Sequence, residues 1–324
     1  SSLEAYVQES GRAGRDGLPS ASLVMLSSGD GVAVENRLRA SVPDRSGVKG
    51  LLSSLAAKGE HIISLYEASA VHDLPDVVVD RILFDLKRRG LLTERGAGYK
   101  YYKVRPLFRM EEILCGRDEE ESAFLQWLDG HREGQVLDLA VECGISWEEV
   151  AARLEDLALS GEWKVEQRQT ALLLYSGGFP VNEAVEELMR YFTGALHHGL
   201  ERWELCVSAL TAEACLNRRL DEYFGFEKAG PSCGHCPACC GTVPGKMEEE
   251  KEEPWSEELR GAVMELAGQR KSALSRPSQM TRFLLGLASP AAMRSRLWSH
   301  PLYGALAERK WKDVWIEARA LMDS

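Results

Sequence analysis

The sequence predicts a mainly α-helical protein with small β-hairpins, arranged as several modules along the chain. Three observations support this prediction. Helical patterns recur along most of the chain, two separate segments end in β-type runs, and five of the eight cysteines fall between residues 215 and 240. A chain of 324 residues is long enough for two or three compact domains, each with its own hydrophobic core.

The overall charge of −11 at pH 7 argues against a chain that coats nucleic acid through bulk charge, although local basic faces can still exist. No apolar run approaches the roughly 20 residues that cross a bilayer, and no basic-then-apolar signal segment opens the chain. We therefore expect a cytoplasmic location and no membrane partner. Because the sequence lacks an initial methionine and opens inside a motif, we expect a piece of a longer protein.

Residues 1–45 are expected to form the end of a larger α/β domain. A first helix leads into the loop GRAGRDGLPS, an apolar strand is expected at 21–26, and a second helix is expected near 30–40. This segment alone is too small to bury a core of its own, so we expect it to complete a domain that begins earlier.

Two consecutive segments, 46–106 and 107–180, each predict a winged helix. In the first segment, helical patterns precede two β-type runs, and glycines at 96–98 indicate a turn between them. In the second segment, Ser146 and Glu149 form a capping-box signature that begins a helix. The run WKVEQRQTALLLYS that follows is expected to form another hairpin. The order of helices followed by a hairpin is typical of a winged helix, so we expect a tandem pair.

The remainder of the chain is expected to divide into a helical cysteine-containing module at 181–245, an acidic linker at 246–254 and a basic helical C-terminal domain at 255–324. Two helices are expected in the module, at about 181–197 and 200–223. The steps Ser289-Pro290 and His300-Pro301 should break the C-terminal domain into short helices, because proline rarely continues a helix.

Two arginines near the N-terminus, Arg12 and Arg15, form the sharpest chemical motif. On a helix their spacing places both guanidinium groups on one face, and Gly11 and Gly14 let the backbone come close to a ligand. An arginine stabilises the negative charge that spreads over phosphate oxygens during phosphoryl transfer, because its planar fork is always charged. The alternative for an isolated pair is a surface helix with salt-bridging arginines.

The whole string resembles motif VI of superfamily 2 helicases in the form that is typical of the RecQ family. The matching residues are Tyr6, Gln8, Glu9, Gly11, Arg12, Ala13, Gly14, Arg15, Asp16, Gly17, Pro19 and Ser20. The resemblance implies the end of a RecA-like motor lobe, in which Arg12 and Arg15 face the phosphates of ATP and Gln8 helps to position them. The phosphate loop and the acidic box that would hold ATP and Mg²⁺ do not occur in this sequence, so we expect no ATP hydrolysis by this chain alone.

The cysteine cluster indicates a metal site. Cys233, Cys236 and Cys239 offer three thiolates at CxxCxxC spacing, and Cys215 offers a fourth from the preceding helix. Four soft ligands suit a structural Zn²⁺ with no open coordination position. His235 and Cys240 are alternative ligands, and reduced cysteines packed as small apolar residues are the alternative to a metal.

The segment CLNRRLDEYFGFEKAGPSCGHCPAC (215–239) also resembles the zinc module of the RecQ family. The matching residues are Tyr223, Phe224, Gly225, Cys233, Gly234, Cys236 and Cys239. Leu216 and Asn217 stand where the family usually has two arginines, which puts DNA contact by this helix in doubt, although Arg218 and Arg219 could compensate. The winged helices also precede the zinc module here, whereas in the family the winged helix follows it, so we expect a divergent bacterial member.

Three segments differ in local charge. Residues 76–105 carry eight basic and four acidic side chains, residues 146–170 carry three and six, and residues 270–312 carry nine and one. We expect DNA contact in the first segment, through phosphates and a stacking tyrosine. The candidate residues there are Lys87, Arg88, Arg89, Lys100, Tyr101 and Lys103. The alternative is a solvated basic face with tyrosines packed on the core.

The acidic second winged helix is expected to be a spacer or a protein-docking module. The basic C-terminal segment fits contact with single-stranded or junction DNA and docking onto a motor lobe equally well. Taken together, the resemblance implies the C-terminal part of an ATP-dependent 3′–5′ DNA helicase that acts in repair and recombination. The alternative is a regulator that binds DNA or protein and has a degenerate or absent motor, and an unrelated zinc transcription factor would leave the arginine motif unexplained.

Overall fold

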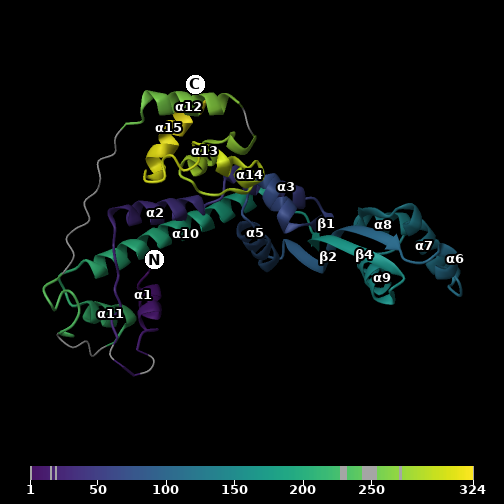
Figure 1. Cartoon of the computed structure of the whole chain (residues 1–324), viewed down its shortest axis with the longest axis horizontal. Coiled ribbons are helices and arrows are strands. Elements are labelled where there is room, and N and C mark those ends of the chain that lie inside the picture. The colour runs from purple at the N-terminus through teal and green to yellow at the C-terminus, as the bar shows by residue number, and fades with distance from the viewer. Residues whose placement is uncertain are drawn as a thin grey trace. The chain divides into compact units, whose positions relative to one another are not determined.

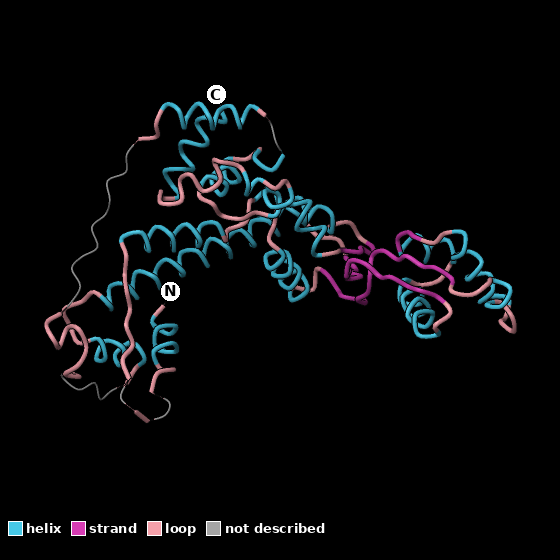
Figure 2. The backbone as a smooth tube through the Cα atoms, in the orientation of Figure 1, coloured by secondary structure: helices cyan, strands magenta, loops and turns pink. Residues whose placement is uncertain are grey.

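The computed structural model describes residues 2–14, 17–18, 20–226, 232–242, 254–269 and 272–323. The protein is mainly helical and contains one four-stranded antiparallel sheet (Figures 1 and 2). It divides into two compact units, one of residues Arg45–Leu188 and the other of Ser1–Asp44 together with Met189–Ser324. Across the described residues, no helix combines the length and the apolar character that a membrane crossing requires.

The N-terminal segment forms two helices, α1 (Leu3–Ser10) and α2 (Ser28–Ala40). Ser2 caps α1 by accepting a hydrogen bond from the backbone N–H of Ala5, and Ser27 begins α2 with a capping box. The predicted strand at 21–26 is wrong, because this segment has no regular structure and Leu23 and Met25 are each 84% exposed. A strand is held by backbone hydrogen bonds to a neighbour, and none of the described strands pairs with this segment.

The first half of the unit Arg45–Leu188 contains three helices and two strands. In order these are α3 (Arg45–Leu55), β1 (Gly59–Ile63), α4 (Leu65–His72), α5 (Asp76–Arg88) and β2 (Leu92–Pro106). Helix α5 buries Val78, Ile82 and Leu86, which recur at helical spacing and face the core. Gly90 adopts a φ of 72°, which lets the chain leave the helix and enter β2.

The second half repeats the same order of elements. It contains α6 (Met110–Ile113), α7 (Glu119–Gly130), β3 (Glu133–Gln135), α8 (Val136–Cys143), α9 (Trp147–Ser160) and β4 (Trp163–Ser176). Helix α9 begins where the capping signature predicted, because the Ser146 hydroxyl accepts a hydrogen bond from the Glu149 backbone N–H over 3.1 Å. Leu125, Leu139 and Leu154 are fully buried and join the three long helices in one core. Helix, strand, helix, helix and strand thus occur twice in succession.

The two predicted hairpins are wrong, because each is a single long strand. Strands β2 and β4 pair with each other along their whole length, from Leu92 opposite Ser176 to Pro106 opposite Trp163. Strand β1 extends the sheet beside β4, and β3 extends it beside β2, which gives the order β1-β4-β2-β3 (Figure 2). The two halves therefore share one sheet instead of each forming its own wing.

The glycines at 96–98 serve close packing and do not form a turn. A Cβ added at Gly98 would lie 2.6 Å from Cη2 of Trp147, the first residue of α9, whereas a Cβ at Gly96 would lie 3.5 Å from the same indole. The buried Trp147 ring thus lies directly on the backbone of β2, which only glycine at position 98 permits. Glycines in a row can therefore mark either a turn or a strand on which a large side chain packs closely, and the sequence alone does not distinguish the two.

Helices α10 (Val181–Leu210) and α11 (Leu216–Phe224) follow the sheet. The predicted break near residue 198 is wrong, because α10 continues without interruption to Leu210. Gly199 lies within it and approaches α2 closely, since a Cβ there would be 2.9 Å from Cδ2 of Leu38. Helices α2 and α10 lie side by side (Figure 1). The predicted acidic linker lies outside the described residues apart from its last residue, Pro254.

The C-terminal segment forms short helices around a separate core. These are α12 (Glu257–Gly268), α13 (Pro277–Leu284), α14 (Pro290–Arg294) and α15 (Trp311–Asp323), with single 3₁₀ turns at Ser272–Leu274 and Leu297–Ser299. The predicted break at Ser289-Pro290 is confirmed, because Ser289 caps α14 and Pro290 is its first residue. Met280, Phe283 and Val314 are completely buried in this core.

Two polar side chains join these C-terminal helices to α2 and the residues after it. The amide of Asn36, which is 2% exposed, donates to the Arg309 carbonyl over 2.8 Å and accepts from the Trp311 backbone N–H over 2.7 Å. The carboxylate of Asp44 pairs with Arg276 at 3.3 Å and with Arg282 at 3.2 Å. Part of the basic charge of the C-terminal segment is therefore used for docking within this unit.

Candidate metal centre and the arginine motif

Four cysteines converge at the end of the second unit. The sulfur atoms of Cys215, Cys233, Cys236 and Cys239 all lie within 4.8 Å of one another. Individual Sγ–Sγ distances are 3.4 Å for Cys236–Cys239, 3.9 Å for Cys233–Cys239 and 4.0 Å for Cys236–Cys215. A tetrahedral zinc with Zn–S bonds of about 2.3 Å requires sulfur atoms about 3.8 Å apart. The cluster therefore has the dimensions to hold one metal ion such as zinc.

The local backbone conformation brings the four sulfur atoms close together. Cys215 directly precedes α11, and its Sγ accepts a hydrogen bond from the Cys233 backbone N–H over 3.4 Å. The Cys236 backbone N–H is 3.3 Å from the Sγ of Cys233. Gly234 adopts a φ of 77°, which turns the chain between these two cysteines. Backbone N–H groups directed at sulfur favour the thiolate, which is the form that binds a metal.

Hydrogen bonds also change the acidity of two of the ligands. The Ser232 hydroxyl, 3.1 Å from Sγ of Cys239, lowers the pKa of that thiol to about 6, and the Gly234 backbone N–H adds to the effect. The Arg218 backbone N–H, in the first turn of α11, lowers the pKa of Cys215. Both shifts favour the thiolate form that binds a metal. The pKa of Cys233 is instead raised, because burial and its contacts with Cys236 and Cys215 outweigh the hydrogen bonds from the backbone N–H groups of His235 and Cys236.

The two alternative ligands lie outside this group. The Nδ1 atom of His235 is 2.7 Å from the Cys233 carbonyl, and the exposed Cys240 has its Sγ 3.8 Å from the Gly234 carbonyl. Neither side chain is among the four whose sulfur atoms converge. Cys206, in α10, is buried, and burial raises the pKa of its thiol, so it behaves as a small apolar residue.

The helix that precedes the arginine motif packs on the same body as the cysteines. Leu3 of α1 is 3% exposed and lies in a cluster with Cys206 and Ala209 of α10. Leu216 and Leu220, on the helix that follows the first cysteine ligand, pack against this cluster. Helix α1 is thus held between the end of α10 and the metal-binding module.

A polar network reinforces this packing through Glu4. Its carboxylate accepts a hydrogen bond from the Tyr223 hydroxyl over 2.6 Å and pairs with Arg202 at 3.0 Å. Arg202 also donates to the hydroxyl of Ser2, the cap of α1, over 3.1 Å. These interactions, of which the Tyr223 hydrogen bond is the strongest, lower the pKa of Glu4 to about 2. Glu4 therefore stays ionised and connects α1 to both α10 and α11.

Tyr6 brings α1 close to the cysteines themselves. Partial burial raises the pKa of the Tyr6 hydroxyl, and the neighbouring Cys236 and Cys206 side chains add to this shift. Cys236 is one of the four converging cysteines and is 6% exposed. The arginine motif and the candidate metal centre are therefore adjacent in the folded chain, although the first cysteine ligand, Cys215, lies 195 residues after Ser20, the last residue of the motif.

The motif residues themselves lie at the surface. Arg12 is 58% exposed at its side chain and forms an ion pair of 3.1 Å with Glu9, and Gln8 is also exposed. Gly11 ends α1, and Gly14 has a φ of 69°, with its Cβ position only 2.7 Å from the Ser20 hydroxyl. The second arginine of the motif, Arg15, lies outside the described residues.

The predicted DNA-binding residues of the first winged helix are engaged by acidic neighbours. Lys87 pairs with Glu94 at 2.7 Å, Arg88 with Asp85 at 3.0 Å, and Arg89 with both Asp85 and Glu187. Lys100 and the Tyr101 hydroxyl both contact Glu67, and Lys103 pairs with Glu133 at 2.9 Å. In the zinc module, Arg218 pairs with Glu222 at 2.9 Å and Arg219 donates to the Ser208 carbonyl over 2.7 Å.

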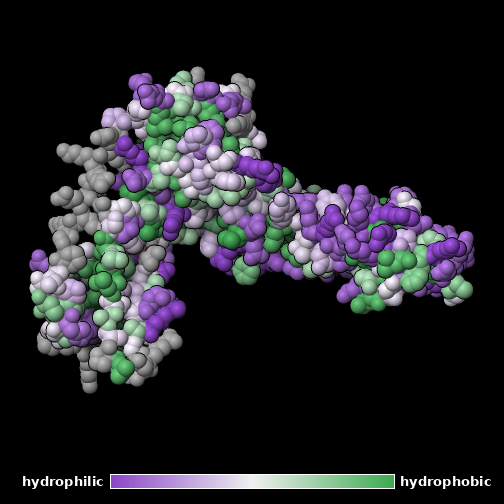
Figure 3. All heavy atoms as spheres, viewed as in Figure 1, coloured by the Kyte–Doolittle hydropathy of each residue, from purple (hydrophilic) through white to green (hydrophobic). Residues whose placement is uncertain are grey.

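This pairing reduces the positive potential that the basic sequence predicted. Glu67, Glu133 and Glu187 lie outside the segment 76–105, so a count of local charge misses them. The face of the unit that Figure 3 displays is covered with hydrophilic side chains over the sheet and α8, but both signs of charge contribute to that surface. A phosphate backbone would have to replace these carboxylates before it could bind there.

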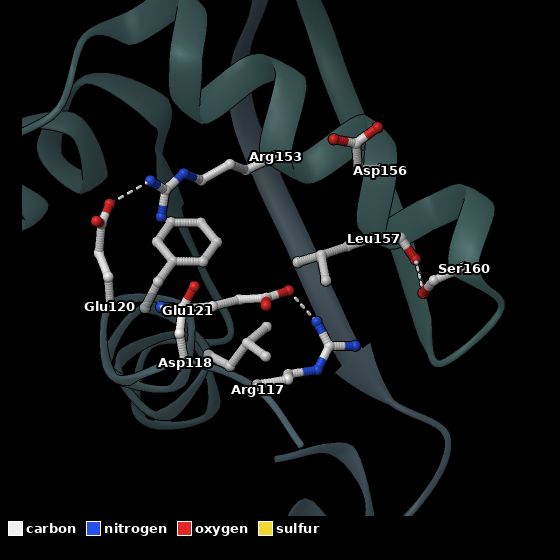
Figure 4. A pocket seen from close by; sticks show the side chains of 10 residues that line it. Arg117, Asp118, Glu120, Glu121, Arg153, Asp156, Leu157 and Ser160 are labelled. Carbon is white, nitrogen blue, oxygen red and sulfur yellow. Dashed lines mark hydrogen bonds and ion pairs between the residues drawn. The ribbon is translucent and has the colours of Figure 1, made fainter. Parts of the chain in front are cut away.

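The second half of the sheet unit contains a separate cavity of about 470 Å³ between α7 and α9 (Figure 4). Phe124, Leu125 and Leu157 form its apolar part. Four carboxylates and two guanidinium groups line the rest, from Asp118, Glu120, Glu121, Asp156, Arg117 and Arg153. Arg153 pairs with Glu120 at 2.6 Å and lies over the Phe124 ring at 5.2 Å, and Arg117 pairs with Glu121. The cavity is therefore acidic overall.

Comparison with family models and with curated proteins gives no match for this chain.

Proposed function

We propose that this chain is the C-terminal part of an ATP-dependent DNA helicase of the RecQ type, acting 3′ to 5′ in DNA repair or recombination. The observation that carries the proposal is the match of twelve residues between Tyr6 and Ser20 to a helicase motif, combined with a four-cysteine module of the kind that the same family uses. The contact of α1 with the cysteine module supports it, because two sequence features separated by most of the chain form one body.

In this proposal the arginines of the motif act on the nucleotide. Arg12 and Arg15 would contact the phosphates of ATP, where bidentate cationic side chains stabilise the charge that develops during phosphoryl transfer. The Arg12 side chain is 58% exposed, which makes it accessible to a second motor lobe, and the phosphates would have to replace its ion pair with Glu9. The phosphate loop and the ligands of Mg²⁺ would come from a part of the motor that this sequence does not contain.

The four cysteines would hold a structural zinc. Four thiolates fill a tetrahedral shell and leave no position for water or substrate, so such a site contributes folding energy and no chemistry. Because the cysteine site lies beside α1, a bound zinc would also stabilise this helix, which leads into the arginine motif.

The sheet unit would be a pair of winged-helix halves that exchange strands. The repeated order of helix, strand, helix, helix and strand supports this view, and the long β2–β4 pair replaces two separate wings. In this arrangement each half depends on the strand of the other, so the two halves would fold as one unit.

Two measurements test the proposal. The reading frame that encodes this chain should carry, upstream of Ser1, a GxxxxGK[ST] loop and a DExH box, and their absence would contradict a helicase. The purified chain alone should show no ATP hydrolysis above background with or without DNA, because its sequence contains neither the phosphate loop nor the acidic box that hydrolysis requires. Measurable turnover would refute that assignment.

The second candidate is a regulator that binds protein or DNA without a working motor. The observation that favours it is the acidic cavity between α7 and α9, together with the neutralised basic faces of the sheet unit. An acidic rim around an apolar floor suits a basic, amphipathic segment of a partner protein. A reading frame without the two motor motifs, together with capture of a basic peptide that is lost in Phe124→Ala, would favour this candidate over the helicase.

A further inference from the structure

The C-terminal core presents an exposed basic and aromatic turn at residues 293–299. Trp298 is 55% exposed and Met293 is 46% exposed, and the side chains of Arg294 and Arg296 are also exposed. An exposed tryptophan is unusual in a soluble fold, because burying an indole is strongly favourable. Arg294 and Arg296 precede this tryptophan and Ser299 follows it, so the turn exposes cations and an aromatic ring together. The basic residues of the sheet unit, in contrast, are paired with carboxylates.

The turn is rigid, so its exposed side chains are presented in a fixed arrangement. Leu297 is 4% exposed and Ala292 is 2% exposed, and both belong to the C-terminal core. The Ser289 hydroxyl caps α14, and the backbone N–H groups of Ser295 and Ser299 are hydrogen-bonded to Ala291 and Arg296. The buried Ala292 and Leu297 thus hold the turn on either side of the exposed residues 293–296, and the exposed Trp298 follows directly.

Arg296 has a left-handed backbone conformation, with a φ of 52° and a ψ of 31°. This region is unfavourable for residues other than glycine, asparagine and aspartate, and a glycine here would form the same turn without strain. The chain nevertheless has a long cationic side chain at this position. The exposed Arg296 is followed directly by Leu297, which is 4% exposed, so the left-handed residue lies where the chain re-enters the core.

Two pairs of arginines in the C-terminal segment differ in whether they have an acidic partner. Arg276 and Arg282 pair with Asp44 and dock the segment onto the end of α2. Among the described residues, neither Arg294 nor Arg296 forms an ion pair, and Glu308 is the single acidic residue between 272 and 312. Within the described part of the chain, no carboxylate therefore compensates the charge of the two exposed arginines, in contrast to Lys87 and Lys103.

We propose that the turn at 293–299 binds single-stranded DNA, with Arg294 and Arg296 on the phosphates and Trp298 stacked on a base. This inference rests on the proposed function in DNA handling and names the surface that does it. Two unpaired cations suit a phosphodiester backbone, and an exposed indole offers the flat apolar face on which an unpaired base stacks. Duplex DNA keeps its bases stacked on each other, so the same turn discriminates in favour of single strands.

The test is fluorescence anisotropy of a labelled oligothymidylate with the full 324-residue chain. Arg294→Gln combined with Arg296→Gln removes two cations, so the slope of log affinity against log salt should become shallower by about 1.4, at roughly 0.7 per phosphate contact. Trp298→Ala should weaken binding by about 5- to 150-fold, which corresponds to the loss of one stacked base, and Trp298→Phe should recover most of it. These three side chains are exposed, so circular dichroism should show that the fold is unchanged.

The matched control is Arg88→Gln combined with Arg89→Gln, which removes the same charge from two arginines that already have acidic partners. This control should change the salt slope by much less than the 294/296 pair. If the control carries the whole loss, or if duplex DNA binds as tightly as the single strand, the inference is overturned and the proposed function stands. If the chain binds no DNA at all, both the inference and the proposed DNA-handling role are contradicted.

Discussion

Replacing Gly98 by alanine should destabilise the shared β2–β4 sheet, because the new methyl group collides with a buried indole. The Cβ would lie 2.6 Å from Cη2 and 3.0 Å from Cζ2 of Trp147, which is 4% exposed and has little room to move. Overpacking of a core by one methyl group costs roughly 1–3 kcal/mol, and the lower chain entropy of alanine offsets about 0.4–1 kcal/mol of it. We therefore expect a net loss of up to about 2.6 kcal/mol, and of roughly 1.3 kcal/mol at the middle of the two ranges.

Gly96→Ala is the matched control in the same strand. Its Cβ would lie 3.5 Å from the nearest atoms of Trp147 and Glu148, which is an ordinary van der Waals contact. This substitution should leave stability unchanged or raise it slightly. If the glycines formed a hairpin turn, as the sequence indicates, the two substitutions would not differ in this way.

Hydrogen exchange of peptides from β2 and β4, measured by mass spectrometry on the full chain, gives the local free energy of opening. A double-mutant cycle with Trp147→Ala identifies the cause, because removal of the indole removes the collision. The cost of Gly98→Ala should vanish in that background, with a coupling energy of about 1–3 kcal/mol. Equal effects of the two glycine substitutions, or no coupling to Trp147, would refute the close-packing explanation.

Three further predictions concern the second unit. Freshly purified protein should contain close to one zinc per chain, and a chelator should speed hydrogen exchange of α1 as well as of the cysteine module; below about half an equivalent, the zinc assignment fails. Glu4→Gln should speed hydrogen exchange of α1 above about pH 4.5, because the ionised Glu4 carboxylate stabilises the fold. This difference between the variant and the native chain should shrink as the pH falls towards 2, where the carboxylate becomes protonated. A difference that persists at pH 2 would contradict this. Asn36→Ala should destabilise the C-terminal helices by about 1–3 kcal/mol, since it removes two hydrogen bonds of the buried amide that contribute about 0.5–1.5 kcal/mol each. An unchanged melting profile of α13 and α15 would count against the docking contact.

Local signals in the sequence predicted local features well. The Ser146–Glu149 signature predicted the start of α9, and the Ser289-Pro290 step predicted the start of α14, because a cap or a proline acts within one turn of a helix. The four cysteines were predicted from their spacing and from the resemblance, and their sulfur atoms do converge. These features depend on residues that are near one another in the sequence or that share one chemical property.

Features that depend on distant partners could not be predicted in the same way. Strand β2 pairs with a strand about 70 residues later, and a glycine that fits an indole looks the same in sequence as a glycine that forms a turn. The charges of Lys100 and Lys103 are compensated by Glu67 and Glu133, which other elements supply. The contact of Glu4 with Tyr223 joins residues that are 219 positions apart in the sequence, and no periodic pattern marks either residue.

The most direct test of the proposed helicase is strand separation by the protein that the complete reading frame encodes. With ATP and Mg²⁺, that protein should unwind a duplex with a 3′ single-stranded tail, and Arg12→Ala should abolish unwinding and ATP hydrolysis while DNA binding and zinc content stay unchanged. Absence of ATP-dependent unwinding by the zinc-loaded protein, or full activity of Arg12→Ala, would contradict the account.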